Sequence, residues 1–310
     1  MSKKKIIIIG ASGLIGQKLY KELKNDYKIF VVGRDVDKLK NIFPEAECIN
    51  WQKQAEELVY ILEKAYAVIN LAGRSIQSKR WTEFGKNTIS VSRTSIIQQF
   101  YNLIQKTKKK PKQWIQASAV GFYGNTIDKT NENNKKGKGF LADLSFLMEE
   151  EANLFKNLNI KVISLRTGLV LDKNGGLIQK MKKPFQFHMG GHLGKGNSFF
   201  PWIHMSDEVR AIHFLIQNEN AEGPINLCSP KVITQKEFCK ELAKAMNTYS
   251  WLHIPKWLLK LSFGKQMANE LFLQGQNCFP SKLLELGFEF NYHKIDHALT
   301  DIFKNNKSKN

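Results

Sequence analysis

The sequence predicts an α/β fold, a doubly wound parallel sheet followed by a smaller C-terminal region. Two observations lead to this prediction. Short apolar runs typical of buried strands alternate with stretches of helical period as far as residue 172. The first run, Ile6–Ile9, leads directly into Gly10, Gly13 and Gly16, and a helical repeat begins among these glycines. Strand, tight turn and helix in this order are typical of a nucleotide-binding sheet.

The later elements follow the same alternation. We expect strands at residues 27–32, 45–51, 67–73, 114–119 and 161–165, and helices at residues 17–25, 55–64, 87–107 and 140–158. Pro111 follows the third helix and cannot continue it. Residues 125–139 are polar and rich in lysine, so we expect a flexible loop there.

The alternation breaks after Asp172. A stretch rich in glycine and aromatic residues follows, and then a helix at 206–217, a strand at 223–227 and helices at 235–246 and near 292–302. We expect a nucleotide-binding domain over residues 1–172, completed by sheet segments from about residues 200–230. Residues 173–304 would form a C-terminal substrate or lid region over the sheet's carboxyl edge.

The composition limits the classes of partner. The 310 residues carry a formal net charge of +19, from 41 lysines spread along the chain and only six arginines. Readers of phosphate and bases favour clustered arginine with interleaved aromatic residues, so we expect no nucleic-acid partner. The positive field would still favour anionic ligands.

Cysteine usage and hydropathy narrow the picture further. The cysteines lack metal-ligand spacing, as do the His and carboxylate residues, so we expect reduced thiols and no metal site. No apolar run approaches the roughly 20 residues needed to span a bilayer, and the run after the basic N-terminus is too short for a secretion signal. These features predict a soluble, cytoplasmic protein without a membrane partner.

The glycine turn predicts a dinucleotide site, with a purely structural turn as the alternative. Only glycine lets the backbone contact a pyrophosphate there, and the helix that opens offers unpaired N–H groups. At the tip of the second strand, Arg34 follows Gly33. Arginine suits the 2′-phosphate of NADP(H), whereas the adjacent Asp35 could bind the ribose of NAD(H). We expect NADP(H), although Arg34 could also be a solvated surface residue.

Several segments resemble the extended short-chain dehydrogenase/reductase superfamily. Gly10–Gly16, Asn70–Gly73 and Ser118 carry the general resemblance. A narrower one, to the atypical branch described as NAD(P)-dependent epimerase- or dehydratase-like and often mislabelled as a cell-division inhibitor, rests on further motifs. These are Arg80-Trp81, Ser92-Arg93, Ser118–Gly124, Leu165–Leu171, Gly175-Gly176, Gly190-Gly191, Trp202–His204 and Gly287-Phe288.

The resemblance implies an NADP(H)-binding Rossmann domain and a small C-terminal domain, but no particular substrate. It implies pyrophosphate contacts from the glycine turn, adenosine contacts after the second strand, and ribose or nicotinamide contacts from later segments. The cofactor-binding residues would be Gly10, Ser12, Gly13, Leu14, Ile15, Gly33, Arg34, Leu71, Ala72, Gly73, Arg93, Thr167 and Val170. For Arg93, an ordinary salt bridge on its own helix is an equal alternative.

The catalytic pair usual in this superfamily is missing. Hydride transfer ordinarily uses Tyr-x-x-x-Lys on one helix, because the ammonium lowers the pKa of the phenol. With the helix aligned on Glu149, these positions carry Leu141 and Ser145. Ser118 could bind a substrate carbonyl, and Tyr123 could exchange a proton with the substrate oxygen if a nearby cation stabilised its phenolate. Structural packing is the alternative for Tyr123.

Four residues are candidate substrate contacts. Arg80 and Trp81 could bind an anionic or planar group, with packing of the indole as the alternative, and Trp202 would line the cleft. His204 could act as an acid or base near neutral pH, or could merely anchor the start of the helix at Ser206.

Two functions fit these residues. The first is an NADP(H)-dependent oxidoreductase or epimerase-like enzyme acting on a small molecule. The second is a catalytically silent dinucleotide-binding sensor, which the missing Tyr/Lys pair favours. The sequence indicates neither the substrate nor the oligomeric state.

Overall fold

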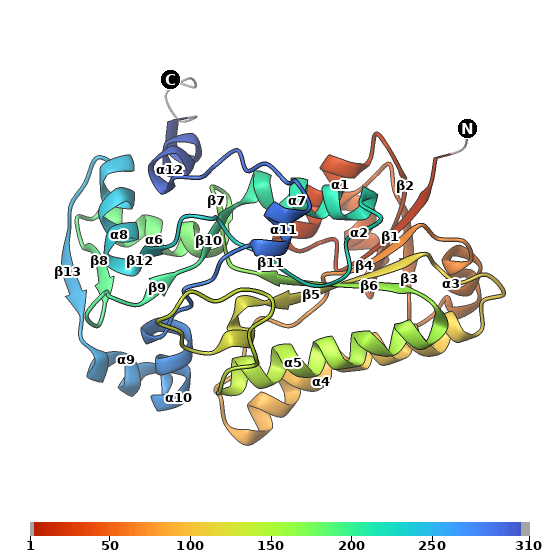
Figure 1. Ribbon diagram of the computed structural model, residues 1–310, viewed down its shortest axis with the longest axis horizontal. Coiled ribbons are helices and arrows are strands. Elements are labelled where there is room, and N and C mark those ends of the chain that lie inside the picture. The colour runs from red at the N-terminus through yellow and green to blue at the C-terminus, as the bar shows by residue number, and fades with distance from the viewer. Residues whose placement is uncertain (1–2, 305–310) are drawn as a thin grey trace.

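The central sheet contains seven parallel strands in the order β11-β6-β5-β4-β1-β2-β3 (Figure 1). The structure, a computed structural model, describes residues 3–304. The strands are β1 (Lys5–Ile9), β2 (Lys28–Gly33), β3 (Glu47–Asn50), β4 (Ala67–Asn70), β5 (Gln113–Ala119), β6 (Lys161–Thr167) and β11 (Gly223–Leu227). This parallel order, reversing at β1, confirms the predicted doubly wound sheet.

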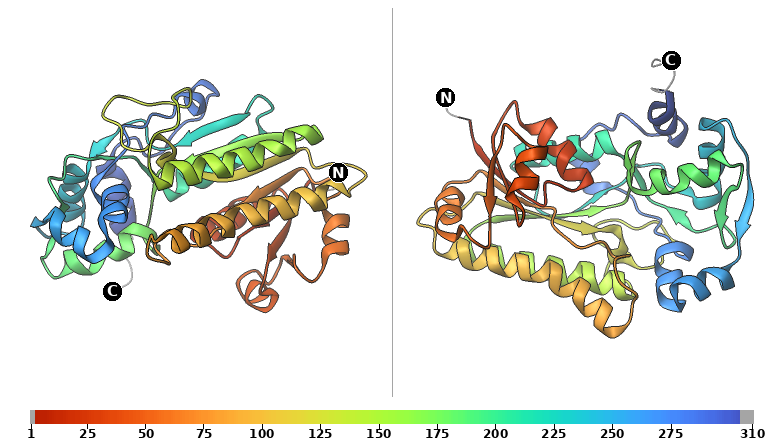
Figure 2. Two further views of the ribbon diagram at one scale, coloured as in Figure 1. Left: turned by 90° about the horizontal axis from the view of Figure 1, so that it is seen from below. Right: turned by 180° about the vertical axis from the view of Figure 1, so that it is seen from behind.

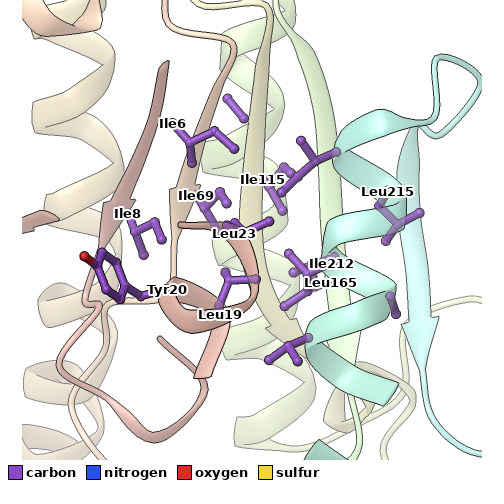
Figure 3. Close-up of a cluster of buried hydrophobic side chains, with 14 of the residues drawn as sticks. Ile6, Ile8, Leu19, Tyr20, Leu23, Ile69, Ile115, Leu165, Ile212 and Leu215 are labelled. Carbon is purple, nitrogen blue, oxygen red and sulfur yellow. The ribbon is translucent and has the colours of Figure 1, made fainter. Parts of the chain in front are cut away.

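Helices cover both faces of the sheet because the side chains of each strand alternate between two cores. One face carries α1 (Leu14–Leu23), α2 (Val36–Ile42) and α7 (Met205–Gln217); the other carries α3 (Ala55–Leu62), α4 (Glu83–Gln105) and α5 (Phe140–Asn153). Ile6 and Ile8 of β1 pack with α1 (Figure 3), whereas Ile7 and Ile9 belong to the opposite core. On that opposite face α4 and α5 lie side by side (Figure 2).

The C-terminal region has a core of its own at the end of the molecule where the strands finish (Figure 1). Its elements are β7 (Leu169–Asp172), α6 (Gly176–Gln186), β8 (Gly190–Leu193), β9 (Phe199–Phe200), β10 (Trp202–His204), β12 (Ile233–Thr234), α8 (Gln235–Ala245), β13 (Ser250–Ile254), α9 (Lys256–Phe263), α10 (Lys265–Ala268) and α12 (Ile295–Lys304). Helix α11 (Ser281–Glu285) lies beside β11, and its Leu283 joins the core of the central sheet. Three short helical turns complete the list: η1 (Val120–Tyr123), η2 (Leu154–Leu158) and η3 (Asn269–Leu273).

Polar caps account for two differences from the predicted helices. Helix α4 begins four residues earlier than expected because Thr82 Oγ1 accepts a hydrogen bond from the Gly85 amide at 3.1 Å. Helix α2 was missed, although Asp35 caps it by accepting from the Lys38 amide at 3.0 Å. A helix of seven residues leaves too short a periodic pattern to be recognised in a sequence.

The polar segment 125–139 is irregular, as expected of a loop, but hydrogen bonds anchor it to the rest of the chain. Its backbone is bound to a distant part of the chain: the Thr130 amide donates to Asn277 O at 2.8 Å, and the Phe279 amide donates to Thr130 O at 2.8 Å. Glu132, in the same segment, is 6% exposed. Two amides of the segment, those of Thr126 and Thr130, are satisfied by Gly275 and Asn277, so the segment is anchored although most of its residues are exposed.

Candidate active site

The glycine turn after β1 has the shape that a dinucleotide phosphate requires. Gly10 has φ +79°, and a Cβ there would lie 2.7 Å from the Cα of Ala72. A Cβ at Gly16 would lie 2.6 Å from the backbone of Ala11. Only glycine therefore lets the turn pack against the β4 loop and lets α1 approach the turn. Residues Ser12–Ile15 remain at least partly exposed at the N-terminus of α1, where unpaired amides attract anions.

Arg34 and Asp35, the two candidate ligands of the adenosine ribose or its 2′-phosphate, have different environments at the end of β2. Arg34 is exposed, and its backbone oxygen is fixed by the Asn50 Nδ2 donor at 2.8 Å. Asp35 uses a carboxylate oxygen to cap α2. A Cβ at Gly33 would lie 2.9 Å from the side chain of Leu39, so glycine lets α2 pack closely against the strand end. The tip of β2 thus presents the guanidinium, while Asp35 has a structural task.

Arg93 of α4 lies against the loop that follows β4. A Cβ at Gly73 would lie 3.1 Å from Arg93 Nε, and Arg93 Nη1 is buried without a hydrogen-bond partner in the described chain. Burial lowers the pKa of the guanidinium. Within residues 3–304 no ion pair to Arg93 is present, so the alternative of a plain salt bridge is not realised. An unpaired, partly desolvated cation beside a predicted cofactor loop fits an anionic or hydroxylated ligand.

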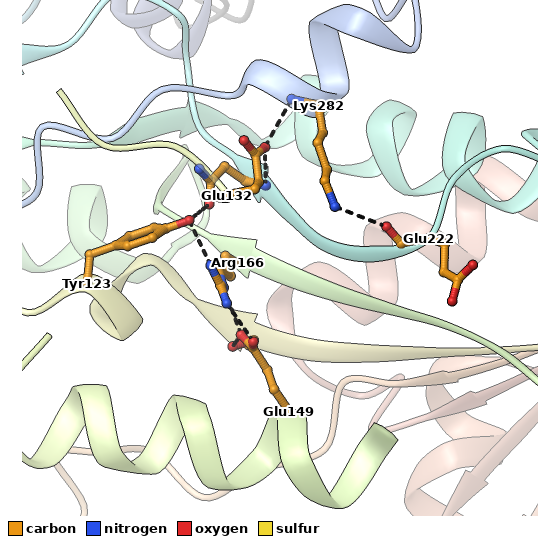
Figure 4. Close-up of polar contacts among 8 residues, drawn as sticks. Tyr123, Glu132, Glu149, Arg166, Glu222 and Lys282 are labelled. Carbon is orange, nitrogen blue, oxygen red and sulfur yellow. Dashed lines mark hydrogen bonds and ion pairs between the residues drawn. The ribbon is translucent and has the colours of Figure 1, made fainter. Parts of the chain in front are cut away.

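Ser118 belongs to a chain of polar groups that joins β5, α5 and β6. Its Oγ donates to Glu149 Oε1 at 2.7 Å, and Glu149 binds Arg166 through both carboxylate oxygens, at 2.9 and 2.8 Å (Figure 4). Burial alone would lower the pKa of Arg166, but the hydrogen bonds and charge of Glu149 raise it. The bidentate pair therefore fixes the carboxylate that holds the Ser118 hydroxyl.

Tyr123 lies at the other end of this chain and is 2% exposed. Its hydroxyl donates to Asn226 Oδ1 at 2.8 Å and accepts from Arg166 Nη1 at 2.9 Å. Arg166 is thus the nearby cation that the sequence could not identify. Burial nevertheless raises the pKa of Tyr123 above its usual range, outweighing Arg166. A phenol that is buried, hydrogen-bonded on both sides and hard to ionise favours a structural role over direct proton transfer.

Leu141 stands in the first turn of α5, at the expected tyrosine position. A Cβ at Gly121 would lie 3.3 Å from Leu141 Cβ, so the leucine packs directly against the turn that follows β5. Ser145, at the expected lysine position, is 5% exposed. No ionisable side chain therefore stands at either position of the usual catalytic pair.

An acid of α7 that the sequence did not single out, Glu208, lies against the end of β6. Thr167 Oγ1 donates to Glu208 Oε1 at 2.9 Å, and Glu208 Oε2 is buried without a partner in the described chain. Burial raises the pKa of Glu208 to about 8. Thr167 therefore directs its hydroxyl toward α7. Val170 is partly exposed on β7.

The four predicted substrate contacts differ in exposure. Arg80 is exposed on the β4–α4 loop, whereas Trp81 packs edge-on against Phe140 at 4.8 Å and donates from Nε1 to Ile76 O at 2.9 Å. The indole of Trp81 thus anchors its own loop, which was the alternative prediction.

Trp202 and His204 lie in the interior, and the structure does not support their predicted contact with a substrate. Trp202 is 1% exposed within the C-terminal core, and its Nε1 is buried there without a hydrogen-bond partner in the described chain. His204 is 7% exposed, accepts from the Ser206 amide at 3.2 Å as the N-cap of α7, and lies 3.9 Å from the ring of Tyr292. Burial lowers its pKa, so a neutral cap is its physical role.

Sequence reasoning assigned no role to Glu149, Arg166, Asn226 or Glu208. The available signal was weak: Arg166 interrupts an apolar strand, and a buried cation requires a partner. Its partner, Glu149, is 17 residues away on another element. No cluster of three metal-ligating side chains occurs in residues 3–304.

Comparison with known proteins gives the ancestry of this site. The model of the NAD dependent epimerase/dehydratase family matches residues 6–142, and a domain of unknown function, DUF1731, matches residues 254–302. An epimerase family protein of Staphylococcus epidermidis is 35% identical over 304 residues, covering 97% of this chain and 99% of that protein. The chain belongs to the epimerase family. A relative from Staphylococcus aureus matches with the same identity and coverage.

Solved structures extend the comparison to a bound cofactor. Human epimerase family protein SDR39U1, solved with NADPH, superposes with a TM-score of 0.87 at 26% identity, covering 97% of this chain and 99% of that one. A nucleoside-diphosphate sugar epimerase of Corynebacterium glutamicum shares the fold, with a TM-score of 0.78 at 24% identity over 98% of this chain and 59% of that one. These relatives confirm the resemblance to the atypical epimerase-like branch.

Proposed function

We propose that this epimerase family member is an NADP(H)-dependent oxidoreductase or epimerase-like enzyme acting on a small molecule. The observation that carries the proposal is Arg93, whose Nη1 is buried without a partner beside the Gly73 loop. Leaving a buried donor unpaired costs free energy, and an anionic cofactor would satisfy it. The glycine turn with φ +79° at Gly10 provides the matching pyrophosphate cradle.

The preference for NADP(H) over NAD(H) rests on the tip of β2. Arg34 is exposed there, and a guanidinium binds a phosphate dianion through two parallel hydrogen bonds. Asp35, the competing ribose ligand, caps α2. The human relative solved with NADPH adds support.

For the chemistry, we assign the contact with the reacting oxygen to Ser118. A bound nicotinamide supplies or accepts the hydride. Ser118 already donates its proton to Glu149, so its lone pairs are available to accept a hydrogen bond from a substrate hydroxyl. Arg166 holds Glu149, and Tyr123 and Asn226 hold Arg166, which fixes the Ser118 hydroxyl in one orientation.

The alternative, a dinucleotide-binding sensor without catalysis, is favoured by one observation. Leu141 packs against Gly121 where a catalytic tyrosine would stand, and leucine cannot transfer a proton. Such a protein would use the same cofactor residues and would lack turnover with any substrate.

The first test is calorimetric titration of the purified protein with NADPH and NADH. We expect NADPH to bind more tightly, and Arg34→Ala to remove most of that preference while NADH binding changes little. Lys40→Ala, an exposed cation on the neighbouring α2, is the matched control and should leave the preference intact. Equal losses for both cofactors in Arg34→Ala would contradict the 2′-phosphate assignment.

The second test separates enzyme from sensor. NADP⁺ reduction is followed with a panel of compounds that carry a secondary hydroxyl, and Ser118→Ala is compared with Tyr123→Phe. We expect Ser118→Ala to lower kcat by roughly 100-fold with NADPH binding unchanged. Tyr123→Phe should lower kcat less, because it disturbs Ser118 only through Arg166. Tight NADPH binding without turnover across the panel would favour the sensor.

A further inference from the structure

Helix α9 is an exposed apolar helix. Of its eight residues only Leu259 is buried. Trp257 is 66% and Leu261 77% exposed, and Leu258 and Phe263 are exposed as well. Large side chains of this kind seldom gather on the surface of a soluble domain unless that surface binds something.

Further large apolar side chains are exposed on the segments that precede α9 in the chain. Tyr249 and Trp251, at the start of β13, are 71% and 67% exposed, and Phe187 and Met189, after α6, are exposed too. Trp251 Nε1 donates to His188 O at 2.7 Å, and β13 pairs with β8, so the two segments are joined. Figure 1 shows β13 and α9 at the same end of the molecule. We call the surface formed by Phe187, Met189, Tyr249, Trp251, Trp257, Leu258, Leu261 and Phe263 the α9 face.

The chain segments that build the α9 face carry positive charge alone. Residues 173–206 and 242–269 contain nine lysines and not one aspartate or glutamate. The net charge of the whole chain is +19, so these segments supply close to half of it. Lys256, Lys260 and Lys265 are exposed on or next to α9 itself. Lys244 pairs with Glu241 just outside these segments at 2.6 Å, so the positive charge beside the α9 face comes from the other lysines, Lys256, Lys260 and Lys265 among them.

We propose that the α9 face adsorbs to an anionic lipid surface, with α9 lying in the plane of the headgroups. Trp and Tyr rings combine an apolar body with a polar tip, and lysine stems can lie along lipid while their ammonium groups reach phosphate. A second copy of this chain fits poorly, because two surfaces of the same charge repel each other. The proposal goes beyond the proposed function and does not depend on it.

Adsorption is compatible with the hydropathy of the helices. No helix in residues 3–304 has the length and hydropathy to cross a bilayer. The expectation of no membrane partner rested on the same criterion in the sequence, and that criterion does not address a helix that lies on the surface. The proposal of a peripheral contact at the α9 face departs from that expectation.

The test is co-sedimentation of the full chain with vesicles of phosphatidylcholine alone or mixed with phosphatidylglycerol. We expect binding only to the mixed vesicles, weakened by salt, with a blue shift of tryptophan emission. The variant Lys256→Gln/Lys260→Gln/Lys265→Gln should bind at least about tenfold more weakly. The control Lys53→Gln/Lys106→Gln/Lys109→Gln removes the same charge from exposed sites on the nucleotide-binding half and should bind nearly as well as the native chain.

A second pair of variants tests the apolar contact. Trp257→Ser/Leu261→Ser should lose binding and the emission shift, whereas Tyr60→Ser/Phe84→Ser, which changes residues 76% and 77% exposed elsewhere, should keep both. Thermal melting and NADPH titration check that every variant is folded. The proposal is overturned if no vesicle sediments the protein, if the lysine control weakens binding equally, or if Trp257→Ser/Leu261→Ser binds the mixed vesicles as well as the native chain does. Concentration-dependent dimers without vesicle binding would instead assign the face to a second copy.

Discussion

The two edges of the central sheet differ in whether all their buried cations have partners. At the amino edge, where strands begin, lysine ammonium groups are bound to helix carbonyl oxygens. At the carboxyl edge, where strands end, Arg93 keeps a buried nitrogen without a partner in the described chain. Satisfied donors support the fold, whereas a buried donor without a protein partner marks a place where a ligand can bind.

At the amino edge the lysines close the ends of four helices. Lys5 Nζ donates to Glu63 O after α3 at 2.7 Å, and Lys161 Nζ donates to Asn218 O after α7 at 2.8 Å. Lys110 Nζ contacts three carbonyl oxygens at the end of α4, and Lys3 reaches the end of α1. Cations at helix C-termini are stabilising, so part of the lysine excess supports the fold.

At the carboxyl edge the ionisable groups differ in their environments: some are paired and buried, one is buried and neutral, and others are exposed. Arg166 and Glu149 form a buried bidentate pair, and Glu208 is buried as a neutral acid at pH 7. Arg34 is exposed at the tip of β2. This edge therefore combines rigid polar groups with unpaired cations, which is the arrangement of a binding site.

The largest expected effect concerns the locked pair. Arg166→Met leaves Glu149 buried without its cation and should lower the free energy of unfolding by about 3–5 kcal/mol. Lys28→Met is the control, because it breaks an exposed pair with Glu47 and should cost less than about 1 kcal/mol. Urea unfolding measures both free energies. If Arg166→Met lost as little stability as Lys28→Met, the buried pair would contribute no more than the exposed pair.

The next effect is a pH dependence at Glu208. The folded carboxyl has a pKa of about 8 against 4.5 in the unfolded chain, so the neutral acid stabilises the fold fully below about pH 4.5, and this stabilisation is lost as pH rises through 8. Glu208→Gln cannot ionise, so above pH 8 it should be more stable than the native chain by up to about 5 kcal/mol. Unfolding by urea from pH 5 to 9 measures this, with the exposed Glu56→Gln as control. An unchanged pH profile would mean that Glu208 is ionised in the fold.

The third prediction concerns Arg93, the buried cation without a partner in the described chain. Arg93→Met removes a guanidinium that has no partner in the described chain, so thermal stability should stay the same or rise. NADPH should bind roughly 10- to 100-fold more weakly, because a charge-assisted hydrogen bond is lost. Calorimetry and melting separate the two quantities. Lower stability with unchanged NADPH affinity would make Arg93 a structural residue.

The smallest effects belong to the amino edge. Lys110→Met and Lys161→Met should each lower the free energy of unfolding by about 1 kcal/mol, because they remove donors from helix C-termini. NADPH affinity should not change. If either variant weakened NADPH binding as much as Arg93→Met, the two edges would not be functionally separate.

The sequence was sufficient wherever a structural feature is encoded by neighbouring residues. Ile6–Ile9 alternate between two cores, and the glycine at position 10 has the positive φ of a tight turn. Strand period, helix period and turn glycines all act over a few residues, so a single chain displays them. The parallel sheet and the glycine turn were predictable for this reason.

The polar network and the exposure of the aromatic residues depended on tertiary structure. Ser118 and Glu149 are 31 residues apart, and Tyr123 and Asn226 are 103 apart, so no local pattern joins them. Trp202, a predicted substrate contact, is 1% exposed, whereas Trp257 is 66% exposed on a helix that the sequence did not reveal. An aromatic residue suits a core and a binding surface equally well, and only packing between distant elements decides which of the two it joins.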